Sequence, residues 1–195
     1  ALTSGNMKIL LLNYEYPPLG GGGGAASQNI AQALAQKGAE VDVVTSGIGF
    51  SHRYQRDPQP ENVRIISVPV FGRSSRSTAT LISLFSYLVL GWWVTVFLIF
   101  RRKYDVIYSH FVLPTGLLGC VLAGMFRLPH VVNIYGGDIY DPSKASSPHR
   151  SRLLQRLIRR ILYQSTAVVY HSAELKQRLN AYVEGDKLNL VHLPI

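Results

Sequence analysis

Five consecutive glycines, Gly20 to Gly24, follow an apolar run near the start of the chain and could bind an anionic ligand. A glycine backbone has no Cβ atoms, so a ligand can approach it closely. If a helix follows the glycines, its free N–H groups and partial positive charge suit a phosphate group. The run therefore predicts a phosphate-binding turn. The alternative is a flexible turn that binds no ligand.

Two common phosphate motifs do not match this turn. No Lys-Ser or Lys-Thr pair follows the glycines, which excludes the P-loop of nucleoside triphosphatases. Five glycines in a row satisfy the spacing of the dinucleotide fingerprint by composition alone, so this match carries no weight. The next apolar run ends in Val44-Thr45-Ser46, without the acidic residue that binds a ribose. A nicotinamide-dependent enzyme is therefore disfavoured.

Most of the histidines lack the close spacing with cysteine or carboxylates that metal sites use. These are His52, His130, His149, His171 and His192. We predict no metal site from them. Cys120 falls among apolar residues of a predicted helix, so we interpret it as a packing residue rather than a nucleophile.

The composition of the 195 residues limits the class of protein. An apolar fraction of 47% with 16% charged residues is enough for a core, which excludes a disordered, low-complexity or collagen-like chain. The single cysteine excludes a disulfide-stapled scaffold and favours a reducing compartment. The net charge of +9 favours an anionic partner, namely nucleic acid, an anionic membrane or a phosphorylated ligand.

Residues 150–160 hold five arginines and no acidic residue. At about 100° per residue on a helix, four of the arginines share one face and the leucines and isoleucines lie on the other. The four are Arg152, Arg156, Arg159 and Arg160. Three interpretations are open: a solvated surface helix, contact with anionic lipid or a phosphorylated acceptor, and contact with nucleic acid. No groove-reading module or stacking-aromatic motif accompanies the charge, so we do not expect a nucleic-acid partner.

Residues 77–100 contain no charged residue and are long enough to cross a membrane. Small or weakly polar residues recur along them at spacings of three and four, which predicts one stripe on a long helix. The stripe consists of Thr80, Ser83, Tyr87, Gly91 and Thr95. Cationic residues flank the segment on both sides. They are Arg73, Arg76, Arg101, Arg102 and Lys103.

Three interpretations of residues 77–100 are open. The helix could be buried in the core or under a partner domain. It could lie in the membrane interface, with Trp92 and Trp93 as anchors. It could also span the membrane. A span would place the two halves of one strand–helix alternation on opposite sides of a bilayer, which a single sheet does not allow.

Apolar runs alternate with helix-forming segments along the whole chain. The predicted strands are 7–12, 41–45, 63–68, 105–109, 130–134, 167–170 and 188–192. The other predicted helices are 25–37, 115–126, 150–163 and 173–181. This order predicts an α/β fold, a doubly wound, mostly parallel Rossmann-like sheet with helices on both faces. We expect residues 1–6 to be a disordered terminus and residues 7–195 to form a single domain.

Several segments occur in a recognisable order. They are Met7-Lys-Ile-Leu-Leu-Leu-Asn-Tyr-Glu-Tyr-Pro-Pro with the glycines after it, Asp105-Val-Ile-Tyr-Ser-His110 with Pro114-Thr115-Gly116, Pro129-His-Val-Val-Asn-Ile-Tyr135-Gly136-Gly137-Asp138, and Ala167-Val-Val-Tyr-His-Ser172. Together they resemble the N-terminal half of a GT-B glycosyltransferase, most of all the retaining family 4, or "group 1" glycosyltransferases. The resemblance covers about residues 7–195.

The resemblance implies a two-domain enzyme. In this family the N-terminal Rossmann-like domain binds mainly the acceptor, the C-terminal domain binds the nucleotide sugar, and catalysis occurs between them. The C-terminal domain carries two glutamates eight positions apart, and no two glutamates here have that spacing. We therefore expect the donor-binding domain to be absent from this chain, and the fragment alone to be inactive.

The resemblance also implies roles for single residues. His110 matches the family's strand-end histidine, which lies by the transferred sugar and supports catalysis. Its place at the carboxyl end of a strand, where open α/β sheets bind ligands, favours the same role. Gly21 and Gly22 match the glycine loop that approaches the donor diphosphate or the acceptor.

The segment from Tyr135 to Asp138 matches the family's His-Gly-x-Asp turn. Tyr135 stands where many relatives have histidine, which is a departure from the family pattern. Asp138 matches an aspartate that binds acceptor hydroxyls or caps the following turn. We predict Tyr135, Gly136 and Asp138 as substrate-binding residues, with no catalytic metal and no cofactor beyond the nucleotide-sugar substrate.

These features predict a hexosyltransferase-type enzyme that moves a sugar from a nucleotide sugar to a lipid-linked or polysaccharide acceptor, in glycan or lipopolysaccharide biosynthesis. We expect a cytoplasmic protein that touches the anionic membrane face through residues 77–100 and 150–160. One alternative is a non-catalytic module of the same fold that binds a sugar phosphate or nucleotide. Another is a membrane-anchored structural protein whose residues 77–100 span the bilayer.

Overall fold

The computed structural model describes residues 7–47, 59–73, 79–139, 151–183 and 187–194. The chain divides into two compact units, Ala1–Ile107 and Tyr108–Ile195. Some positions named above lie outside the described residues. They are residues 1–6, His52, Arg76, residues 77 and 78, His149 and Arg150.

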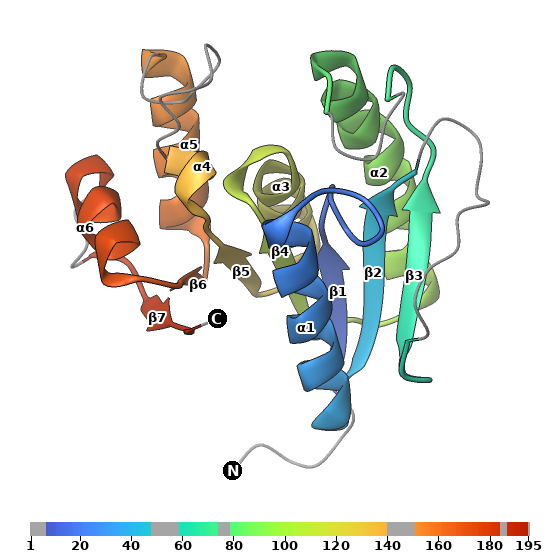
Figure 1. The fold of residues 1–195 in the computed structure, drawn as a ribbon. Coiled ribbons are helices and arrows are strands. Elements are labelled where there is room, and N and C mark those ends of the chain that lie inside the picture. Colours follow the sequence, from blue (N-terminus) through green and yellow to red (C-terminus); the bar gives the residue numbers. More distant parts are fainter. Residues whose placement is uncertain (1–6, 48–58, 74–78, 140–150, 184–186, 195) are drawn as a thin grey trace. The chain divides into compact units, whose positions relative to one another are not determined.

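The first unit is a parallel sheet between helices. Its elements are β1 (Lys8–Leu12), α1 (Gly22–Gln36), β2 (Glu40–Ser46), β3 (Val63–Val68) and α2 (Leu81–Arg101). The strands lie in the order β3-β2-β1, and both neighbouring pairs are parallel. The helices α1 and α2 cover opposite faces of this sheet (Figure 1). The apolar run of β1 is therefore buried on both faces, as a central parallel strand requires.

The helix α2 presents the predicted stripe to the sheet. Its buried residues include Ser83, Tyr87, Gly91 and Thr95, and Tyr87 Oη donates to the carbonyl oxygen of Val44 at 2.9 Å. A capping box formed by Thr80 and Ser83 begins the helix. The rest of α2 is apolar, and the helix is long and apolar enough to cross a membrane by length and composition.

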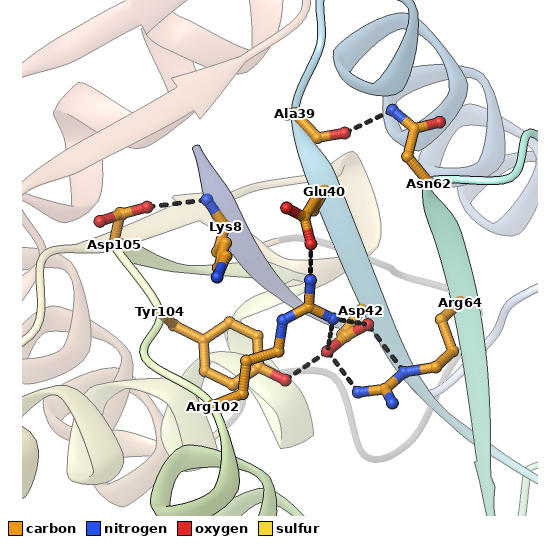
Figure 2. A network of polar contacts seen from close by, with 9 residues as sticks. All are labelled: Lys8, Ala39, Glu40, Asp42, Asn62, Arg64, Arg102, Tyr104 and Asp105. Carbon is orange, nitrogen blue, oxygen red and sulfur yellow. Dashed lines mark hydrogen bonds and ion pairs between the residues drawn. The ribbon is translucent and has the colours of Figure 1, made fainter. Parts of the chain in front are cut away.

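Two of the cationic residues that flank α2 are used inside the fold. Figure 2 shows Asp42, at the amino end of β2, accepting hydrogen bonds from Arg64 at 2.6 and 2.9 Å, from Arg102 at 3.2 Å and from Tyr104. Arg102 also pairs with Glu40. A buried carboxylate needs such partners to offset its desolvation. Arg102 is therefore a structural residue of the sheet's amino edge.

Arg73 has an internal place as well. Its side chain is buried, it donates to Ser46 Oγ at 2.7 Å, and its guanidinium lies 4.8 Å from the centre of the Tyr14 ring. By contrast, the side chains of Arg101 and Lys103 are exposed. Of the described cations that flank α2, these two are the ones available at the surface.

The second unit continues the alternation. The strand β4 (Val106–His110) crosses the boundary between the units. The further elements are the tight turn η1 (Val112–Gly116), α3 (Leu117–Phe126), β5 (His130–Asn133), α4 (Gly136–Ile139), α5 (Arg152–Gln164), β6 (Ala167–Tyr170), α6 (Ala173–Tyr182) and β7 (Leu190–His192). The strands β5, β6 and β7 are neighbours and pair in parallel. Every described strand pair is parallel and helices alternate with most of the strands, which confirms the predicted Rossmann-like α/β class.

The helix α5 is amphipathic as predicted. Ile158, Ile161 and Leu162 lie in an apolar core with residues of β5, β6 and α6, whereas its arginines are exposed. Leu153 was expected on the apolar face, but it is exposed, because it lies in the first turn of the helix beyond the edge of this core.

Candidate functional site

His110 is the last residue of β4 and is fully buried. Its Nδ1 atom lies 2.8 Å from Tyr135 Oη and 3.2 Å from Asn133 Nδ2. Asn133 Nδ2 in turn donates to Tyr135 Oη at 3.0 Å. Asn133 is the last residue of β5 and Tyr135 follows two positions later, so the ends of two strands bring together three polar groups. We call His110, Asn133 and Tyr135 the histidine cluster.

The other ring nitrogen of His110 is unsatisfied. Nε2 is buried and has no hydrogen-bond partner among the described residues. Burial, and next the neighbouring charge of His171, lower the pKa of His110 to about 3, so the imidazole is neutral at physiological pH. An unpartnered buried polar atom costs free energy unless a ligand or water satisfies it. Nε2 is thus a candidate ligand contact, together with two other buried, unpartnered atoms of this unit, Asn133 Oδ1 and His171 Nε2.

Aromatic rings surround Tyr135. Its ring centre lies 4.7 Å from that of Phe111, 5.2 Å from that of His171 and 6.1 Å from that of His110. Phe111 has a φ of 71°, a conformation that non-glycine residues rarely adopt. Its N–H donates to the carbonyl oxygen of Asn133 at 2.9 Å. The chain therefore turns sharply directly after His110, and the hydrogen bond to β5 holds this strained residue in place.

Asp138 connects two turns of the site. Its Oδ1 atom accepts from the backbone N–H of Val112 at 3.1 Å, and its Oδ2 atom accepts from that of Tyr135 at 2.8 Å. Of the two roles that the sequence left open, the structure gives Asp138 a capping role. A role in binding acceptor hydroxyls stays a prediction.

A cavity of about 350 Å³ opens beside Tyr135, at the carboxyl ends of β5 and β6. It is lined by Tyr135, Gly136, His171, Ser172, Glu174, Leu175 and Arg178. Inside it Arg178 pairs with Glu174 at 2.7 Å, so the two charges partly compensate each other. A Cβ atom added to Gly136 would meet nothing within 4 Å, so this predicted binding residue borders open space.

Sequence reasoning missed Asn133, His171 and Arg178. His171 directly follows β6, and the rule that ligands bind at the carboxyl ends of parallel strands could have identified it. Its Nδ1 atom lies 2.6 Å from the carbonyl oxygen of Leu193, and burial lowers its pKa. Asn133 stands two positions before Tyr135, on the same face of an extended chain. No sequence signal marks Arg178.

His130 differs from His110 although both are buried. Its Nε2 atom lies 3.0 Å from Ser109 Oγ, and its Nδ1 atom lies 3.1 Å from Ser165 Oγ. Burial lowers the pKa of His130 to about 4. Both ring nitrogens are satisfied by the chain itself, so His130 is a structural residue. Within the described ranges, no three histidine, cysteine or acidic side chains are grouped so that they could hold a metal ion.

Gly21 and Gly22 belong to the first unit, whereas the other predicted site residues lie together in the second. The helix α1 begins at Gly22 rather than at the expected Ala25, so Gly22 to Gly24 form its first turn. A Cβ atom on Gly21 or Gly22 would meet nothing within 4 Å. On Gly24 it would lie 2.7 Å from the carbonyl oxygen of Glu15. The fold thus requires glycine at Gly24 and leaves open surface at Gly21 and Gly22.

The sequence matches the model of a known protein family over most of its length. The model described as a glycosyl transferase 4-like domain matches residues 21–194. The chain belongs to this family. It is also 29% identical over 185 residues to an uncharacterized glycosyltransferase of Methanocaldococcus jannaschii, across 89% of this chain and 42% of that protein. This confirms the resemblance seen in the motifs.

Solved structures show the same fold for this family member. Sucrose-phosphate synthase from Thermosynechococcus elongatus matches 97% of the chain with a TM-score of 0.78 at 17% identity, over 48% of its own length. HepE from Anabaena, solved with UDP and glucose, matches 96% with a TM-score of 0.56 at 16% identity, over 44% of its own length. The chain therefore has the fold of the N-terminal half of GT-B glycosyltransferases and spans about half the length of these relatives.

The fold alone does not decide the reaction. UDP-N-acetylglucosamine 2-epimerase from Rickettsia bellii matches 96% of the chain with a TM-score of 0.55 at 11% identity, over 44% of its own length. A shared fold with an epimerase carries no activity across. The assignment to a glycosyltransferase family rests on the family match.

Proposed function

We propose that the chain is the acceptor-side domain of a retaining, hexosyltransferase-type enzyme that moves a sugar from a nucleotide sugar to a lipid-linked or polysaccharide acceptor. The observation that carries the proposal is the unpartnered Nε2 atom of His110 at the carboxyl end of β4. Because the chain spans about half of its relatives, a further domain would bind the donor. Two structural neighbours, HepE and an anthocyanidin 3-O-glucosyltransferase, were solved with UDP, which supports a nucleotide-sugar partner.

In this proposal each predicted residue has a defined task. His110 is neutral, so it contributes a hydrogen bond rather than a charge to the transferred sugar. The open backbone at Gly21 and Gly22, at the start of the 15-residue helix α1, contributes N–H groups and a partial positive charge toward a diphosphate. Tyr135, Gly136 and Asp138 shape the acceptor side. Stabilisation of developing charge by such fixed dipoles is a large part of group-transfer catalysis.

The test is turnover of a panel of nucleotide sugars by the full-length protein, with membrane lipids and oligosaccharides supplied as acceptors. Transfer, or slow hydrolysis of one donor, supports the proposal. A well-folded full-length protein that binds nucleotide sugars but turns none over would instead be the non-catalytic module of the same fold.

Gly22→Ala separates a ligand-binding role of the glycine loop from a structural one. The added methyl group meets no atom of the chain, and alanine favours the helix, so the melting temperature should be unchanged or slightly higher. A methyl group in the path of a closely approaching ligand costs about 1–3 kcal/mol, so KM for the nucleotide sugar or acceptor should rise about tenfold or more.

Gly24→Ala is the matched comparison. Its methyl group would collide with the backbone of Glu15, so this variant should melt at a lower temperature. Steady-state kinetics and thermal unfolding of both full-length variants measure the two effects. An unchanged KM in Gly22→Ala would mean that the loop only turns the chain.

We further propose that the protein is cytoplasmic and docks on an anionic membrane face through the outward side of α2. The large apolar side chains on that side are between 43% and 78% exposed. They are Leu81, Ile82, Phe85, Val89, Trp93, Phe97 and Phe100. Exposed apolar patches of this kind are unusual on a soluble surface. A lipid-linked acceptor would then lie in the same membrane to which the protein is bound.

Charge favours a bilayer as the occupant of this surface. No acidic residue occurs from Ala79 to Tyr104, and the exposed cations Arg101 and Lys103 follow the apolar side chains. Anionic headgroups attract such cations while the apolar side chains enter the interface. Trp93 is exposed and Trp92 is half-buried, so the anchoring role expected for both falls mainly to Trp93. The exposed arginines of α5, at 152, 156, 159 and 160, are a second cationic surface that anionic lipid could contact.

A further inference from the structure

The histidine cluster determines which nitrogen of His110 carries the proton. A neutral imidazole has one N–H group and one acceptor nitrogen. Asn133 Nδ2 can only donate, and it lies 3.2 Å from His110 Nδ1 and 3.0 Å from Tyr135 Oη. Tyr135 Oη accepts from the amide and therefore has its own proton free to donate to His110 Nδ1, 2.8 Å away. In this orientation of the amide, in which Asn133 Oδ1 is buried and has no partner among the described residues, two donors point at Nδ1 and make it the acceptor.

The proton of His110 then lies on Nε2. This atom is buried and has no partner among the described residues. It is therefore an N–H donor that faces no acceptor of the second unit. A nitrogen that already carries the proton cannot act as a general base, so the chemistry open to His110 is donation of a hydrogen bond to a ligand oxygen.

We propose that Tyr135 and Asn133 are positioning residues that fix His110 in the Nε2–H tautomer, so that it meets the substrate as a hydrogen-bond donor and not as a base. The contact with substrate rests on the proposed function, whereas the tautomer itself does not. Tyr135 is the residue at which this chain departs from the family's usual histidine. Replacement of Tyr135 by phenylalanine would remove the hydroxyl that donates to His110 Nδ1 and would keep the aromatic ring.

The ligand oxygen could belong to a sugar hydroxyl or to a phosphoryl group, which share the same acceptor chemistry. Titration of the full-length protein with UDP and, separately, with UDP-glucose distinguishes the two. A shift of the Nε2–H signal with both ligands assigns a phosphoryl oxygen, and a shift with UDP-glucose alone assigns a sugar hydroxyl. If neither ligand shifts the signal at concentrations at which it binds, the proposed hydrogen bond from His110 to substrate is wrong.

The tautomer is measured directly by long-range ¹H–¹⁵N correlation spectra of the full-length protein labelled with ¹⁵N-histidine. His110→Gln identifies the signals by their loss. The expected spectrum has a protonated Nε2 and an unprotonated Nδ1, unchanged between pH 8 and pH 5. A protonated Nδ1 would overturn the proposal, because it would mean that Asn133 turns its oxygen toward the ring and that Nε2 is free to act as a base.

Tyr135→Phe tests the positioning role. Loss of one hydrogen bond to Nδ1 should shift the ring toward a mixture of tautomers and lower kcat about tenfold with little change in KM. Tyr170→Phe is the matched control, since its ring stacks on His192 in β7, outside the cluster. An unaltered tautomer and kcat in Tyr135→Phe would overturn the positioning role.

The spectra and the turnover assay test the tautomer and the proposed function separately. If the spectra show the Nε2–H tautomer but no donor is turned over, the proposed function fails while the tautomer assignment stands. If turnover is observed with a protonated Nδ1, the enzyme class stands and the positioning role fails.

Discussion

Replacement of His110 by alanine is expected to lower kcat/KM for sugar transfer by the full-length protein about 100-fold or more. Removal of one fixed hydrogen-bond donor from a buried site typically costs this much. His110 fits that role because it is neutral, fully buried and has an unpartnered Nε2 atom at the end of β4. His110→Gln retains an N–H donor but cannot act as a base, so it should keep more activity than His110→Ala.

His130→Ala is the control for this experiment. His130 is as buried as His110, but its two nitrogens are satisfied by Ser109 and Ser165. The variant should lower the melting temperature and leave kcat/KM of the folded fraction within about threefold of wild type, since only structural contacts are lost. Equal losses in His110→Ala and His130→Ala would show that packing explains both. Full activity of His110→Ala would remove the catalytic role and leave the family assignment intact.

The double variant Phe85→Ser and Trp93→Ser is expected to weaken binding of the full-length protein to anionic vesicles about 30-fold. Each side chain is about two-thirds exposed, so it contributes little to the fold. Each should contribute about 1 kcal/mol when it enters the membrane interface. Co-sedimentation with vesicles of mixed phosphatidylcholine and phosphatidylglycerol measures the change.

Val121→Ser with Met125→Ser is the matched control. These two apolar residues are also exposed, but they lie on α3 and not on α2. They should leave vesicle binding unchanged. Arg101→Gln with Lys103→Gln should weaken binding to anionic vesicles by about 1 kcal/mol per charge and have no effect on uncharged vesicles.

Two results would contradict the membrane proposal. The first is a wild-type protein that does not bind anionic vesicles. The second is self-association in solution that depends on Phe85 and Trp93, which would assign the outward side of α2 to a protein interface.

The periodicity of the sequence determined the elements and their buried faces. The run from Met7 to Leu12 is apolar throughout, which only a strand covered on both faces allows, and β1 is such a strand. Spacings of three and four placed Ser83, Tyr87, Gly91 and Thr95 on one side of a helix, and α2 buries that side. Such patterns are readable because neighbouring residues in one element have fixed relative directions.

The start of α1 was not readable in the same way. Glycine disfavours a helix by intrinsic propensity, so the sequence placed the start at Ala25. The helix begins at Gly22 instead. Within its first turn, Gly24 packs closely on the backbone of Glu15 and Leu19, which leaves room only for glycine. Tertiary packing decided this boundary against local preference.

The partners of charged and polar groups were decided by the tertiary structure alone. Arg73 and Arg102 looked like the flanks of a membrane segment, yet one stacks on Tyr14 and the other pairs with Asp42. Asn133 could be linked to Tyr135 by its spacing, but nothing in the sequence pairs it with His110, 23 positions earlier, whose Nδ1 atom its amide contacts. Spacing along one element fixes which way a side chain points, whereas its partner depends on which strands become neighbours. That choice is made only when the whole sheet assembles.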